Sequence, residues 1–225
     1  MVAKKIFIKA LFITLGILFM IYAINFYMNV KREEVVLERM TQILDEYQEI
    51  QALSLMTTTF GTEISCVSLG NSLSHMDKTL WDTGIKIDRY REAKQQFVTD
   101  PFYVDQKKKF NRNEVIYLSL LRDMKEKCDI NQTLILFFFK KKEDCPDCDA
   151  QSFVLTDINK DIDPEIAIFS FDANLELPSI NTLQAYYNIT TYPCIVVDDK
   201  KYCGLKNKGR VVEILCKNRG HSNCP

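Results

Sequence analysis

The chain has 225 residues, and its 29 lysines and arginines against 30 aspartates and glutamates give a formal net charge of −1 at pH 7. This balance leaves no broadly basic surface, so nucleic acid is excluded as an expected partner. Hydrophobic residues make up 47% of the chain and charged residues 26%, which is typical of a folded protein and excludes a disordered one.

The N-terminal region carries an apolar stretch without a single charge, from Ala10 to Met28. As a helix it would span roughly 28 Å, close to the hydrocarbon thickness of about 30 Å in a bilayer. A cleaved signal peptide would have a shorter apolar region of about 7–15 residues and a small-x-small site after it. We therefore predict a membrane anchor over residues 1–30, with residues 10–28 in the membrane.

The flanking charges predict the orientation of this anchor. Lys4, Lys5 and Lys9 precede the apolar stretch, while Lys31 and Arg32 follow it. The excess on the N-terminal side favours a cytoplasmic N-terminus. The eight cysteines, an even and high number, are typical of an oxidising compartment. We expect a single-pass protein of the cell membrane whose remaining residues are extracytoplasmic.

Residues 31–130 are predicted to form a helical region. Apolar residues recur there at spacings of three and four, as expected for helices packed on one another. Cys66 and Cys128 bracket most of the region, and we favour a disulfide between them. The loop-entropy account assigns such a long crosslink about 4 kcal/mol. The expected helices cover 33–60, 72–97 and 112–127, with Pro101 as the interruption before the third.

From residue 131 the pattern changes to alternating strands and helices. The continuous apolar run 133–139 is typical of a strand buried on both faces. A strand-helix-strand unit requires a right-handed parallel crossover, and a short turn requires an antiparallel hairpin. We expect an α/β domain over 131–225, a mixed sheet flanked by helices. Its predicted elements are strands 133–139, 165–172, 194–198 and 201–205, and helices 147–159, 178–188 and 208–217.

A pair of cysteines, Cys145 and Cys148, lies between the first of these strands and the helix after it. At that position the backbone N–H groups and the positive end of the helix stabilise a thiolate on Cys145. The thiolate is the attacking species in disulfide exchange. Cys148, one turn further on, is placed to attack the resulting mixed disulfide, so the spacing predicts a redox pair.

The segments 134-LILFFF-139, 145-CPDC-148 and 191-TYPC-194, followed by a hairpin and a last helix, resemble the thioredoxin superfamily over about residues 131–218. The resemblance implies a thioredoxin-like fold, with Cys145 as nucleophile and Cys148 as resolving thiol. It also implies a cis-proline at Pro193 that shapes a substrate groove together with Tyr192, Pro146 and Asp147. With its anchor and helical region, the whole chain is similar to membrane-tethered thioredoxin-like proteins of archaea or bacteria.

Two features depart from that family. The buried acid that thioredoxin carries in the strand before the redox pair is absent, because this strand contains Leu, Ile and Phe. Asp147 places a negative charge beside the thiolate, which raises a thiol pKa, whereas Lys140, Lys141 and Lys142 act in the opposite direction. The sequence leaves the net direction open.

The remaining cysteines are expected to form structural disulfides. With a turn at Asp199-Lys200, Cys194 and Cys203 would lie diagonally, about 7–8 Å apart between Cα atoms. A disulfide usually requires less than about 7 Å, so this bond would need a bulge or a shift in register. Pairing of Cys203 with Cys216, or of Cys216 with Cys224, is equally open.

The predicted function is a thiol–disulfide oxidoreductase that needs no cofactor or metal. Its partners would be cysteine-containing polypeptides and a membrane redox partner. One alternative is a non-catalytic docking or chaperone module in which residues 145–148 stay locked as a disulfide. A second alternative is a structural zinc site in which Cys145 and Cys148 join His221 and Cys224.

Overall fold

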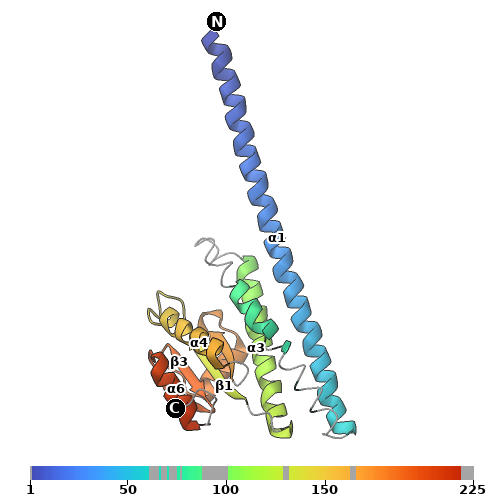
Figure 1. Cartoon of the computed structure of the whole chain (residues 1–225), viewed down its shortest axis with the longest axis vertical. Helices are drawn as coiled ribbons and strands as arrows, with labels where there is room; N and C mark the ends of the chain where they lie inside the picture. The colour runs from blue at the N-terminus through green and yellow to red at the C-terminus, as the bar shows by residue number, and fades with distance from the viewer. Residues whose placement is uncertain are drawn as a thin grey trace.

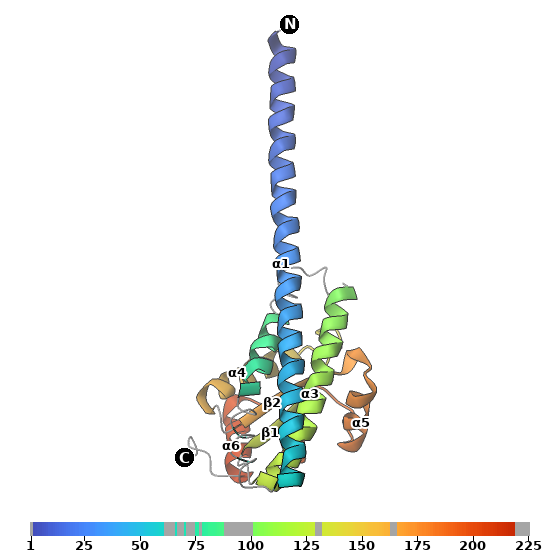
Figure 2. The ribbon, with the colours of Figure 1, turned by 90° about the vertical axis from the view of Figure 1, so that its right-hand side faces the viewer.

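A computed structural model describes residues 2–60, 66, 70, 75–76, 78–87, 101–128, 132–162 and 166–218 of the chain. One long helix, α1 (Val2–Phe60), dominates the shape, and its N-terminal half projects away from everything else (Figure 1). The other elements gather along its C-terminal half, as the view turned by 90° also shows (Figure 2).

The two segments predicted as an anchor and a first helix form this one continuous helix. Phe7–Met28 is long and apolar enough to cross a membrane, and none of it is buried. An N-terminal helix of this kind is compatible with a membrane anchor or a signal sequence. Further along α1, Met40 and Ile43 are buried and join the main hydrophobic core, so the C-terminal half of α1 packs on the folded part.

The helical region differs from the sequence prediction at Pro101. Helix α3 (Pro101–Cys128) begins at this proline, eleven residues before the predicted start at 112. Proline suits a first helical turn, because its missing N–H would have no partner there. Residues 78–87 are also helical, within the predicted range 72–97, whose other parts lie mostly outside the described residues. A disulfide joins Cys66 to Cys128, the pairing that the sequence favoured.

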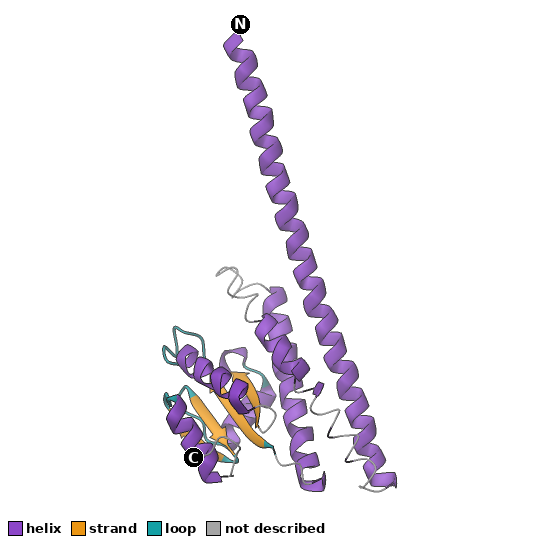
Figure 3. Ribbon diagram, in the orientation of Figure 1, coloured by secondary structure: helices purple, strands orange, loops and turns teal. Residues whose placement is uncertain are grey.

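The C-terminal region forms a mixed sheet in the order β2-β1-β3-β4, with helices on both faces (Figure 3). β1 pairs with β2 in parallel and with β3 antiparallel, and β3 and β4 form a hairpin. This arrangement is an α/β thioredoxin-like fold, as predicted. The elements are β1 (Thr133–Phe139), α4 (Cys148–Ile162), β2 (Ile166–Asp172), η2 (Ala173–Leu175), α5 (Pro178–Tyr186), β3 (Cys194–Val197), β4 (Lys200–Cys203) and α6 (Lys208–Asn218).

The central strand β1 is buried on both faces, as its continuous apolar sequence predicted. Ile135 and Phe137 pack in a cluster with residues of α4 and α6. Leu136 and Phe138 point to the opposite face, into the larger cluster built with α3 and α5. Side chains of a strand alternate between faces, so one apolar run serves both layers.

The hairpin register differs from the prediction. The turn residues are Asp198 and Asp199, both at positive φ (42° and 67°), not Asp199 and Lys200. Two-residue hairpin turns often require positive φ at both central positions. The register therefore places Cys194 directly opposite Cys203, where the two form a disulfide with Cα atoms 3.9 Å apart. The diagonal placement expected from the sequence is wrong.

Strand β2 forms one edge of the sheet within the described part of the chain, and α3 covers that edge with side chains. Glu114 Oε1 accepts the N–H of Ser170 at 2.9 Å. Asn111 Oδ1 accepts the N–H of Asp172, also at 2.9 Å. An uncovered edge strand presents unpaired backbone groups to other chains. Helix α3 thus supplies acceptors that a neighbouring strand would otherwise provide.

A polar cluster also fastens α3 to α5 and the hairpin turn. Arg122 donates to the Tyr187 hydroxyl at 2.6 Å and to both oxygens of Asp199 at 2.8 and 2.9 Å. The Tyr187 hydroxyl donates to Asp199 at 2.7 Å. Burial, together with the hydrogen bond to Asp199, raises the pKa of Tyr187 to about 12.

We predict that Phe138→Ala lowers the free energy of unfolding by about 3–5 kcal/mol, because it removes a fully buried ring. Phe138 is 0% exposed, and its ring centroid lies 5.4 Å from that of Phe171. Phe153→Ala is the matched control, since Phe153 is 73% exposed on α4. Urea denaturation followed by circular dichroism compares the two. Equal stabilities for both variants would contradict this packing.

We also predict a stability loss at alkaline pH that depends on Tyr187. Its pKa is about 12 in the folded protein against an ordinary 10.0, so the folded state holds the proton more tightly. The resulting stabilisation is complete below pH 10 and is lost as the pH rises through 12. Between pH 10 and 12, the thermal unfolding temperature should fall less steeply with pH for Tyr187→Phe than for the wild type. Tyr186→Phe, at a position 72% exposed, should follow the wild type.

Candidate redox site

The cysteine pair lies in the connection between β1 and α4. The Lys141 carbonyl accepts the N–H groups of Asp144 at 3.0 Å and of Cys145 at 2.9 Å, which closes a turn after the strand. The N–H of Cys148 donates to the Cys145 carbonyl at 3.2 Å, and α4 begins at Cys148. Cys145 and Cys148 are joined by a disulfide, with Cα atoms 5.4 Å apart.

Both sulfur-bearing residues are buried in this disulfide form. Cys145 is 2% exposed and Cys148 is 3% exposed, whereas Pro146 and Asp147 between them are exposed. Disulfide exchange at Cys145 requires access of the partner's sulfur to this residue. In the disulfide form Cys145 is bonded to Cys148, and neither residue is accessible in this way.

The peptide bond between Tyr192 and Pro193 is cis. Phe138 pairs with Cys194. Pro193, the residue before β3, therefore lies beside the end of β1, where the turn that carries the cysteines starts. The Lys140 ammonium lies 4.8 Å from the centroid of the half-buried Tyr192 ring, a cation–π contact between the two segments. Burial raises the pKa of Tyr192.

The loop after β4 connects Pro193 to α4. Gly204 N–H donates to the Pro193 carbonyl at 2.7 Å, and Lys206 N–H donates to Gln151 Oε1 at 2.7 Å. Gly204 has φ +78°, a conformation that L residues with a side chain rarely adopt. Gln151 is buried one turn beyond Cys148 on α4. Pro193 and the helix that carries Cys148 are therefore held by one short loop.

The other described cysteines are bonded in other disulfides. Cys194 belongs to the core cluster on the α3 and α5 face of the sheet, not to the α4 and α6 face. Since Cys203 is bonded to Cys194, the alternative pairing of Cys203 with Cys216 is wrong. Cys216 is itself disulfide-bonded, and Cys224 lies outside the described residues.

The zinc alternative meets a chemical obstacle in this form of the protein. Zinc binds cysteine as a thiolate, and the sulfurs of Cys145 and Cys148 are bonded to each other. No cluster of three or more potential ligands occurs among the residues that the structure describes. His221 and Cys224 lie outside them.

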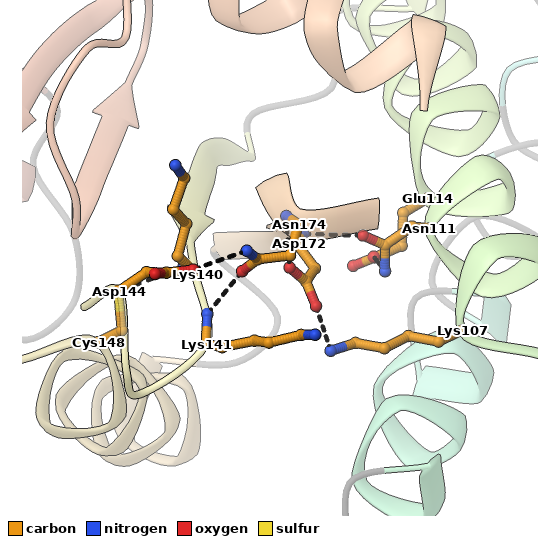
Figure 4. Close-up of polar contacts among 9 residues, drawn as sticks. All are labelled: Lys107, Asn111, Glu114, Lys140, Lys141, Asp144, Cys148, Asp172 and Asn174. Carbon is orange, nitrogen blue, oxygen red and sulfur yellow. Dashed lines mark hydrogen bonds and ion pairs between the residues drawn. The ribbon is translucent and has the colours of Figure 1, made fainter. Parts of the chain in front are cut away.

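The sequence prediction does not include a polar network beside the turn that carries the cysteines, which Figure 4 shows. It contains Lys107 from α3, Asp172 from the end of β2 and Asn174 from η2. Starting the third helix at 112 left Lys107 outside it. Two signals were available: the Asp-x-Asn pattern directly after a buried strand, and polar residues at 107, 111 and 114, a helical spacing, on an otherwise apolar helix face.

No protein-family model and no curated protein matches the chain. Among solved structures, it is similar to a malarial protein at 17% identity and a TM-score of 0.34, over 39% of this chain and 97% of that one. It is also similar to thioredoxin-2, a component of malaria parasite protein secretion machinery, at 20% identity and a TM-score of 0.34, over 39% and 84% of the two chains. The fold assignment rests on the strand order β2-β1-β3-β4 and on the helices that cover the sheet.

Proposed function

We propose that this chain is a thiol–disulfide oxidoreductase that acts on cysteine-containing polypeptides. The observation that carries the proposal is the Cys145–Cys148 disulfide between β1 and α4. The neighbouring strand β3 is preceded by the cis peptide bond at Pro193. A short Cys-x-x-Cys ring at a helix start is suited to reversible exchange. The exchange itself requires no bound cofactor.

In the reducing direction, the Cys145 thiolate attacks a disulfide sulfur of the polypeptide. A mixed disulfide forms, and one polypeptide cysteine leaves as a thiolate. The Cys148 thiolate then attacks the Cys145 sulfur, which forms the 145–148 disulfide and expels the second polypeptide thiolate. Two electrons pass to the polypeptide and both leaving thiolates take up protons from water.

The same steps run backwards when the chain oxidises a dithiol. The potential of the 145–148 couple relative to its partner sets the direction. Tyr192, half-buried before Pro193, would offer backbone groups to an extended polypeptide, as in strand addition, and exposed Pro146 and Asp147 would form the rim of this groove.

Regeneration of the couple requires a second dithiol–disulfide protein, which we place in the same membrane. The support is the exposed apolar segment Phe7–Met28, continuous with the helix on which the folded part packs. The excess of lysines before this segment favours a cytoplasmic N-terminus and an extracytoplasmic redox site.

A second candidate function is a docking or chaperone module in which the 145–148 disulfide is never opened. The burial of Cys145, at 2% exposure, favours this reading, because exchange needs access along the disulfide axis. The two functions differ in whether the reduced protein reacts through Cys145.

We predict that Cys148→Ser accumulates mixed disulfides with polypeptides, because the thiol that expels the substrate is missing. Purification of this variant from membranes and non-reducing electrophoresis should reveal adducts that dithiothreitol dissolves. Cys145→Ser should form none and should lose turnover in an insulin reduction assay. Both variants leave the Cys194–Cys203 bond intact, so it serves as an internal control for folding.

Alkylation decides between the two functions. After mild reduction, Cys145 should react with iodoacetamide at neutral pH faster than an unperturbed cysteine of pKa about 8.5. A slow reaction, together with no adducts in Cys148→Ser, would remove the enzyme and leave the docking module.

We predict that the full chain stays in the membrane pellet after alkaline carbonate extraction, because Phe7–Met28 is long enough to span the hydrocarbon core. A variant without residues 2–28 should appear in the supernatant. N-terminal sequencing of the mature full-length protein tests the signal-sequence alternative. An N-terminus beyond residue 28 would show that the segment is removed.

A further inference from the structure

A chain of polar contacts runs from α3 to the turn that carries the cysteines (Figure 4). The Lys107 ammonium pairs with Asp172 Oδ2. The other oxygen of Asp172 accepts the Asn174 N–H at 2.9 Å. The Asn174 side chain accepts the Lys141 N–H at 2.7 Å through Oδ1 and donates to Asp144 at 3.0 Å through Nδ2.

The inner end of this chain is buried, which makes its members depend on one another. Lys107 is 8% exposed and Asp172 is 2% exposed. A buried charge is costly unless it is paired and hydrogen-bonded, so each fixes the position of the other. The Asp172 backbone is held as well, because its N–H donates to Asn111, whose side-chain amide donates to Glu114 at 3.2 Å.

The outer end of the chain contacts both cysteines through backbone groups. The Lys141 carbonyl, whose N–H is held by Asn174, accepts the Cys145 N–H at 2.9 Å. The Lys140 N–H, one residue earlier, lies 3.5 Å from Cys148 Sγ. An N–H donor on sulfur stabilises a thiolate more than it stabilises a disulfide sulfur, because the charge is larger.

We propose that α3 is part of the redox centre, and that Lys107 acts through Asp172 and Asn174 as a positioning residue for Cys148. The inference rests on the oxidoreductase function proposed above. The buried ion pair anchors Asn174, Asn174 holds the turn at 140–144, and the turn keeps the Lys140 N–H on Cys148 Sγ. The step it affects is the attack of Cys148 on the mixed disulfide.

The full-length protein in detergent provides the first test, with oxidised glutathione as the probe. Glutathione first forms a mixed disulfide at Cys145, and Cys148 then expels it in a separate first-order phase. Asn174→Ala should slow the second phase about tenfold, the scale of one weakened charge-assisted hydrogen bond, with little change in the first phase. Asn181→Ala, at an exposed position on α5, is the matched control.

The equilibrium constant with glutathione provides a readout that a general loss of stability would not move. A less stabilised Cys148 thiolate favours the disulfide, so Asn174→Ala should shift the constant toward the oxidised protein by up to about tenfold, or about 30 mV for this two-electron couple. An unchanged constant and an unchanged second phase in a folded Asn174→Ala protein would overturn the proposal.

Lys107 is tested against a neighbour of the same type. Lys107→Met should slow the second phase and shift the equilibrium constant as Asn174→Ala does. Lys107→Arg should keep both quantities at their wild-type values. Lys109→Met should do neither, because Lys109 forms an exposed ion pair with Asp105. If Lys107→Met fails to fold, the double variant Lys107→Met/Asp172→Asn removes the pair without leaving a buried charge unpaired. Wild-type values in the double variant would refute a role for Lys107.

The glutathione phases separate the oxidoreductase function from the role of α3. A wild-type protein that shows no glutathione phases at all refutes the oxidoreductase. Two normal phases in the wild type, with no difference between Asn174→Ala and Asn181→Ala, refute only the role of α3.

Discussion

The buried ion pair between Lys107 and Asp172 is the contact on which the arrangement of the folded part depends. It lies where α3 meets the end of β2, between the helical region and the sheet. Neither charge could remain in the interior alone, so the two elements are held in one relative position. From that position α3 also reaches the backbone of β2 through Asn111 and Glu114.

In this arrangement the helical region has a structural role, because α3 covers the edge of the sheet. A four-stranded sheet with β2 at its edge would expose backbone donors to other chains. Side chains of α3 occupy those donors, and the Arg122 cluster fastens the same helix to α5 and the hairpin turn. Contacts therefore cross residue 130, where the sequence suggested a domain boundary, at both ends of α3.

Local patterns in the sequence were sufficient for much of the fold and for the cysteine pair. The apolar run 133–139 favoured a central strand, because strands buried on both faces have continuous apolar sequences of this length. The Cys-Pro-Asp-Cys segment and the Tyr-Pro before β3 were equally local signals. They located the two halves of the candidate site before any contact was known.

Other features depended on geometry that local patterns do not determine. Pro101 was interpreted as a break when it begins a helix, and this displaced Lys107 from its helix. The register of the hairpin followed from positive φ at Asp198 and Asp199, where an Asp199-Lys200 turn was equally plausible from the sequence. The Lys107–Asp172 pair joins residues 65 positions apart. The helical spacing of 107, 111 and 114 indicates a polar face on α3, but it does not indicate which strand that face contacts.

Helix α1 continues without a break from its apolar segment to Phe60, and this continuity sets how far the folded part lies from a membrane. With Phe7–Met28 in a bilayer, residues 29–60 of α1 would extend about 48 Å from the membrane surface as one continuous helix. Met40 and Ile43 are buried in the main core and so hold the folded part at one position along α1. If the 145–148 couple exchanges disulfides, a partner would have to present its sulfurs at that distance from the membrane surface, since the folded part packs directly on α1.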